Sequence, residues 1–200
     1  MPKPNDGVLS WDEGKQLLAA CAGKRARDVR DRAIVVLGLR TGMLRSSMCE
    51  LTIKDLKLGL DGDSGYTLTF TKKGGDRHTI KLDPDTLRVL AEWIECLKSQ
   101  GITSGRLFRS ISKGDQATGS RLTPDGLYRA IGARAEIAKL EMTGYMFHRT
   151  FAAWARRARA NDEQIAQVTG TGVELLESKT SKPPANFVIG RLLRRERFRR

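Results

Sequence analysis

Apolar residues recur along this 200-residue chain mostly at the three- and four-residue spacing that is typical of α-helices. The first such stretch follows Ser10, which together with Glu13 has the spacing of a capping box. Because a capping box satisfies free N–H groups at a helix start, this pair predicts a helix. That helix should carry Leu17, Leu18 and Cys21.

A second run, residues 33–39, is apolar on nearly every side. A helix that is hydrophobic all round is normally buried, so this run predicts a central helix of the core. Thr41-Gly42 should end it, since glycine accepts the left-handed backbone that closes many helices. A further helix is expected from about Ser46, carrying Met48 and Leu51.

Two segments have the composition of strands instead. Residues 66–71 and 78–82 are rich in Thr, Tyr, Phe and Ile, and Gly74-Gly75 lies between them. This arrangement predicts a β-hairpin with a glycine turn. An earlier short strand is expected within residues 52–58.

The second half of the chain returns to helical spacing. Asp83-Pro84-Asp85 predicts a helix that ends before Gly101, and Thr123-Pro124 predicts the next. Two more helices are expected at 147–160 and 162–168. The fold class predicted is therefore α+β, mainly helical, with a small antiparallel sheet. The helix after Asp83 is expected to share one apolar face among Leu87, Leu90, Ala91, Ile94 and Leu97.

The ends of the chain differ in composition from its middle. Residues 1–8 are predicted to be a flexible arm and residues 9–177 one domain. Residues 178–200 are predicted to be a linker with Pro183-Pro184, followed by a basic tail with six arginines among the last ten residues.

The charge is strongly positive, with 36 Lys+Arg against 23 Asp+Glu and a formal net charge of +13. Such a balance favours a polyanionic partner, although a basic ribosomal or membrane-surface protein has a similar composition. The three cysteines, Cys21, Cys49 and Cys96, are predicted to be buried free thiols. With no apolar signal region and no apolar run long enough to span a bilayer, the chain is predicted to be cytoplasmic, without membrane contact.

Cofactor chemistry has no support in the sequence. The two histidines, His78 and His148, and the scattered cysteines lack the spacing of metal ligands. No phosphate-binding loop or dinucleotide fingerprint is present. We therefore expect neither a metal nor a cofactor.

Five short segments follow one another in a recognisable order over about 150 residues, and each carries a motif. They are residues 41–48 with Asp55 downstream, the lysine-bearing hairpin 72–77, and the segments 107–110, 146–152 and 164–171. Their types, order and spacing resemble the catalytic domain of tyrosine recombinases of the phage-integrase type. The family's N-terminal core-binding domain has no counterpart here, so the chain is expected to be a stand-alone half or a fragment.

The resemblance implies a chemistry, because this family attacks a DNA phosphodiester with a tyrosine. Two arginines stabilise the charge on the phosphate, a lysine protonates the leaving oxygen, and histidines assist. In this chain the two arginine positions hold Leu44 and His148, and the lysine position holds Lys73. The last histidine position holds Thr171. The nucleophile would fall near Thr180, and no tyrosine follows Tyr145.

The neighbours of these positions do not obviously restore the missing groups. Tyr145 stands where the family has a histidine, and Arg149 follows His148 as if the two charge types were exchanged. Arg45 follows Leu44, but one residue along a helix turns a side chain by roughly 100°. Arg45 could instead be a solvated surface arginine, and His148 and Arg149 two polar residues on a basic helix. Tyr145 is predicted to pack with its hydroxyl in contact with water.

The resemblance thus implies a DNA-binding protein on a recombinase fold that has lost strand cleavage and could regulate or assist a mobile element. Its partner would be double-stranded DNA in the nucleoid, and its tail could dock on a second copy or on a recombinase. Two alternatives remain open: an active site-specific recombinase with a rearranged site, and a basic RNA-binding or partner-binding protein. No catalytic residue is predicted, and the predicted DNA-binding residues are Arg45, Lys72, Lys73, Arg77, His148, Arg149 and Arg156.

Overall fold

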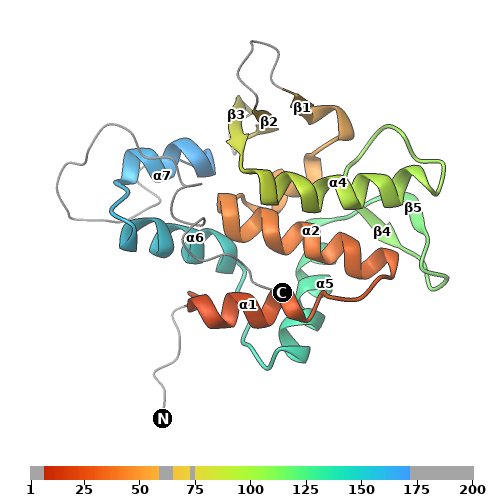
Figure 1. The fold of residues 1–200 in the computed structure, drawn as a ribbon, viewed down its shortest axis with the longest axis horizontal. Coiled ribbons are helices and arrows are strands. Elements are labelled where there is room, and N and C mark those ends of the chain that lie inside the picture. Colours follow the sequence, from red (N-terminus) through yellow and green to blue (C-terminus); the bar gives the residue numbers. More distant parts are fainter. Residues whose placement is uncertain (1–6, 59–64, 73–74, 172–200) are drawn as a thin grey trace.

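A computed structural model describes residues 7–58, 65–72 and 75–171 of the chain. Its arrangement is shown in Figure 1. Most of the predicted arm, Lys73, the position near Thr180 and the whole basic tail lie outside the described residues.

The long helix α2, Ala26–Thr41, lies at the centre of the fold and contacts α1, α4, α5 and α6. The predicted buried run lies within it, and residues 33–35 and 37 are fully buried. The helix ends as expected at Gly42, whose φ of 63° is left-handed. Gly38 lets α6 approach closely, because a Cβ there would stand 2.5 Å from the ring of Phe147.

The first helix, α1 (Trp11–Ala19), begins with the predicted capping box between Ser10 and Glu13. The indole of Trp154 on α6 contacts it, with its ring centroid 4.8 Å from that of Trp11. The same indole donates to the carbonyl of Leu9, and the Leu9 N–H donates to the Thr150 hydroxyl. The start of the described chain is therefore fixed against α6.

The predicted hairpin is confirmed and belongs to a three-stranded antiparallel sheet. Its strands are β1 (Leu56–Leu58), β2 (Tyr66–Thr71) and β3 (Arg77–Leu82), in the order β1-β2-β3. Leu68 of β2 pairs with Ile80 of β3, and both are buried. A single turn of 3₁₀ helix, Ile53–Asp55, leads into the sheet.

A second hairpin was not predicted. It consists of β4 (Arg109–Ile111) and β5 (Ala117–Arg121), which are half-buried or exposed. Its sequence lacks the alternation of apolar and polar residues that marks a strand. At its tip the carboxylate of Asp115 accepts hydrogen bonds from the N–H groups of Ala26 and Arg27, so the hairpin caps the start of α2.

The helices α4 (Pro84–Lys98) and α5 (Pro124–Ile137) have the predicted Asp83 and Thr123 caps with proline at the first turn. The predicted apolar face of α4 was partly wrong. Ala91 is exposed, whereas Val89 and Trp93 are buried, because the Trp93 indole reaches into the core and donates to the Leu107 carbonyl at 2.8 Å.

Three shorter helices complete the fold. They are α3 (Arg45–Glu50), α6 (Met146–Arg157) and α7 (Asp162–Thr169). The last begins with a capping box between Asn161 and Gln164. It joins the sheet through His78, whose Nε2 lies 2.5 Å from the Gln167 carbonyl oxygen.

Two further features hold the core together. A buried charge cluster, defined as Asp28, Arg30, Asp31 and Arg134, links α2 to α5, with Arg134 bonded to both aspartates. All three cysteines are free as predicted, although Cys96 is only half-buried. No helix in the described part of the chain is long and apolar enough to cross a membrane.

Candidate nucleic-acid interface

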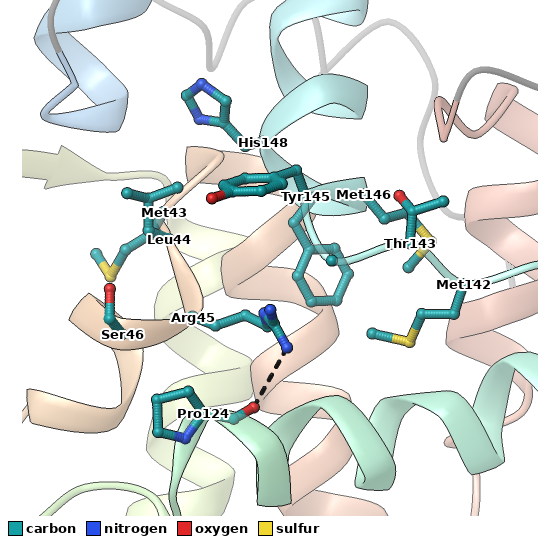
Figure 2. A pocket seen from close by; sticks show the side chains of 12 residues that line it. Met43, Leu44, Arg45, Ser46, Pro124, Met142, Thr143, Tyr145, Met146 and His148 are labelled. Carbon is teal, nitrogen blue, oxygen red and sulfur yellow. Dashed lines mark hydrogen bonds between the residues drawn. The ribbon is translucent and has the colours of Figure 1, made fainter. Parts of the chain in front are cut away.

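The two positions where the family carries arginine lie at one pocket. Its cavity of about 260 Å³ is formed by residues 43–46, by Pro124 at the start of α5 and by residues 142–148 at the start of α6. Figure 2 shows Leu44, Tyr145 and His148 around one end of this pocket, and Arg45 beside Pro124 at the other.

His148 is held by the backbone at the end of α2. Its side chain is 8% exposed, and Nδ1 lies 3.0 Å from the Gly42 carbonyl oxygen. Because a carbonyl only accepts, the ring proton must be on Nδ1. Burial lowers the pKa of His148 below its ordinary value of 6.5, and the charge of Arg156 lowers it further. The ring is therefore neutral at pH 7, with a lone pair on Nε2.

Arg45 also lines this pocket but extends toward α5. Its Nη1 donates to the Pro124 carbonyl at 3.4 Å, and its guanidinium lies 4.9 Å from the centroid of the Tyr128 ring. Leu44, which caps α3, offers no charge at all. The pocket thus has a cation at one end and a neutral imidazole at the other.

Two basic residues of the hairpin, Arg77 and Lys72, form ion pairs within the fold. Arg77 donates to Asp55 at 2.6 Å, and Lys72 lies 4.0 Å from Asp76. Burial alone would raise the pKa of Asp55, but hydrogen bonds from Arg77 and Thr52 outweigh it and lower that pKa. Arg77 is thus the cation of an internal ion pair as well as a predicted DNA contact.

Helix α6 carries the remaining predicted contacts. Arg149 is exposed on its first turns, on a different side from buried His148. Arg156 forms an ion pair with Asp162, at 3.0 Å, which ties α6 to α7. Arg157 and Arg159 are exposed nearby.

The structure brings some family positions together and leaves others apart. The stem of Lys72 lies against Gly170, beside Thr171 at the family's last histidine position. The Thr171 hydroxyl is 2.7 Å from that of Thr169. Arg45 and His148 share the pocket, whereas Arg77 pairs with Asp55 outside it.

Tyr145 was predicted to pack, and that prediction was wrong. The side chain is 60% exposed at the rim of the pocket, one of two large hydrophobic residues with such exposure in the described part of the chain. Its position just before the first residue of α6 was the available signal, since a helix-capping residue need not pack.

Solved structures confirm the predicted fold. XerA recombinase is similar with a TM-score of 0.70 and 21% identity, covering 88% of this chain and 60% of XerA. XerH recombinase bound to its difH substrate before cleavage has a TM-score of 0.65 and 19% identity, covering 85% of this chain and 49% of XerH. A λ integrase dimer bound to a core site has a TM-score of 0.55 and 15% identity, covering 94% and 65%.

This chain therefore spans less than two thirds of each of those three proteins. No curated protein matches it. Its sequence matches the phage integrase family over residues 8–170, which is most of its length and nearly all of the described fold. The chain thus belongs to the phage integrase family of tyrosine recombinases.

Proposed function

We propose that this chain binds duplex DNA through its basic face and does not cleave it. The observation that carries the proposal is the chemistry of the two arginine positions, Leu44 and His148. One side chain there is a hydrocarbon and the other is a neutral ring whose N–H is already donated to Gly42.

Strand cleavage requires groups that stabilise the negative charge of the transition state. Removing a single preorganised donor from such a site typically costs about 3 kcal/mol of stabilisation. Leu44 donates nothing, and the Nε2 of neutral His148 accepts rather than donates. With no tyrosine after Tyr145 in these 200 residues, a covalent phosphotyrosine at the family's position also lacks its nucleophile.

Exposed basic residues lie on and around α6 and support DNA binding. Arg149, Arg157 and Arg159 are exposed on or just after α6, and Lys72 projects from the hairpin beside α7. Together with the net charge of +13, they favour contact with phosphates. Phosphate contacts of this kind give affinity and position, not sequence reading.

The test is the salt dependence of duplex binding. Each phosphate contact should contribute about 0.9 to the slope of log affinity against log salt concentration. Replacing Lys73, Arg149 and Arg156 together with alanine should lower that slope by roughly three units, one for each contact. Arg88→Ala, which removes an exposed arginine paired with Glu92 on α4, is the matched control and should leave the slope unchanged.

An unchanged slope in the triple variant would show that these residues are not the footprint. RNA is the competing ligand to include, because a basic surface binds any polyanion. If an RNA duplex competes better than DNA at equal salt, the RNA-binding alternative replaces this proposal.

The biological role we propose is regulation or assistance of a mobile element by a cytoplasmic protein that is nucleoid-associated when bound to DNA. The basic tail, residues 178–200, would contact a second copy or a recombinase partner. Sedimentation of the chain with and without residues 178–200, on DNA, tests that part separately. An identical assembly state for both would show that residues 178–200 do not mediate assembly.

A further inference from the structure

The pocket beside α6 is poorly suited to a phosphate but offers features that suit another ligand. Leu44 and Met146 contribute apolar surface to its mixed lining, and Tyr145 stands exposed at the rim. The cavity of about 260 Å³ is just below the roughly 300 Å³ at which pockets for drug-sized molecules begin. A flat ring system of one or two rings is the size it can take.

Two side chains that line this pocket, Thr143 and His148, each have a polar atom without a partner in the described part of the chain. His148 is nine-tenths buried and makes one hydrogen bond, from Nδ1 to the Gly42 carbonyl. Its Nε2 therefore keeps a lone pair that needs an N–H donor. A phosphate oxygen is itself an acceptor and would oppose this lone pair.

The opposite end of the pocket offers a hydrogen-bond donor, Arg45, instead of an acceptor. The guanidinium of Arg45 lies there, and its hydrogen bond to the Pro124 carbonyl is long, at 3.4 Å. The ligand should thus combine a flat apolar body, an N–H edge and a negative group. Each nucleotide of DNA combines these three features in one unit.

Resting on the proposed DNA binding, we propose that this pocket receives one unpaired nucleobase of the bound DNA. The base would stack on Tyr145, present an N–H of its pairing edge to Nε2 of His148, and leave its phosphate toward Arg45. A paired base cannot do this, because its edge is occupied by its partner and its faces by its neighbours. The pocket therefore selects a bulged or frayed nucleotide.

An inorganic anion or a purely apolar molecule would leave part of this pocket without a partner. A free inorganic anion would satisfy Arg45 but would leave Nε2 of His148 and the apolar walls without a partner. A purely apolar molecule would bury the Arg45 charge without compensation. Only a ligand with a negative group, an N–H donor and an apolar body has a partner for Arg45, for Nε2 of His148 and for the apolar part of the lining.

The experiment compares three duplexes with the same flanking sequence at low salt: fully paired, with a single bulged adenine, and with a bulged abasic site. The abasic bulge has the same backbone break without the base, so it controls for DNA flexibility. We expect the bulged adenine to bind roughly tenfold more tightly than the abasic bulge, in line with stacking of one base on an aromatic ring.

Two variants locate the effect in the pocket. Tyr145→Ala should remove the preference for the base, whereas Tyr145→Phe, the matched control, should keep it. Because Tyr145 is 60% exposed, neither change should disturb the fold. His148→Asn retains an amide N–H for Gly42 but lacks an atom at Nε2, and should reduce the preference.

The outcomes are distinct. Equal affinity for the adenine and abasic bulges, with both bound, overturns this inference and leaves the proposed DNA binding intact. A preference that persists in Tyr145→Ala also overturns it, because the base is then bound elsewhere. If no duplex binds, both proposals fail.

Discussion

Buried polar groups are fully bonded at the start of helix α2 but only partly bonded at its end. Near its start, the buried charge cluster pairs Asp31, which is 3% exposed, with the guanidinium groups of Arg30 and Arg134. At its end, Gly42 holds His148 by one ring nitrogen and leaves the other without a partner in the described residues. Satisfied buried charge serves the fold, whereas an incompletely bonded polar group at a pocket is free to bind a ligand.

The largest expected effect of this contrast is on stability. Asp31→Ala should lower the free energy of unfolding by about 3–5 kcal/mol, because it leaves buried Arg30 without its carboxylate and Arg134 with Asp28 alone. Urea denaturation followed by circular dichroism measures the change. Asp12→Ala, at an exposed carboxylate paired with Lys15 on α1, is the control and should change stability by less than about 1 kcal/mol.

A loss in Asp31→Ala no larger than in the control would mean that the cluster contributes little. The charge cluster at the start of α2 would then stabilise the fold no more than an exposed ion pair does.

A smaller effect is expected from pH at the other end of α2. The folded pKa of His148 lies below its ordinary value of 6.5, so the unfolded chain binds the proton more readily. The stability contributed by neutral His148 is therefore complete above pH 6.5 and is lost as pH falls below it, by at most about 1.4 kcal/mol per pH unit. The approach of Arg156 should strengthen this loss.

The measurement is the melting temperature between pH 7.5 and 5 for the wild type and for His148→Asn, which does not titrate. The wild type should lose more stability than the variant below pH 6.5. Parallel curves would show that His148 is protonated in the fold as readily as in the unfolded chain, and its Nε2 would then be a donor.

The sequence predicted the elements whose signals are local. The capping box of Ser10 and Glu13, the glycine after Thr41 and the apolar run of α2 depend on residues within a few positions of each other, and the structure confirmed them. The β4–β5 hairpin was missed because strands of Arg, Ser, Thr and Gly carry no apolar alternation. What holds it is a tertiary contact from Asp115 to Ala26.

The sequence predicted which residues form the candidate site, but it did not predict their hydrogen bonds and ion pairs. Motif order placed Leu44 and His148 where the structure brings them to one pocket. The ion pair of Arg77 with Asp55 joins residues 22 positions apart, and the bond from His148 to Gly42 joins residues 106 apart. Such long-range pairs have no local signature, and these bonds decide which nitrogen donates and which charge is compensated.

The central claim is that this chain binds DNA without cutting it, and covalent trapping tests it most directly. Labelled, nicked suicide duplex is incubated with the wild type and with a variant carrying both Leu44→Arg and His148→Arg, and then separated by denaturing electrophoresis. Neither protein should form an adduct, because restoring two arginines does not supply a nucleophile. A slow-migrating species that resists detergent and disappears on protease treatment, formed by the wild type, would show that the chain is a working recombinase.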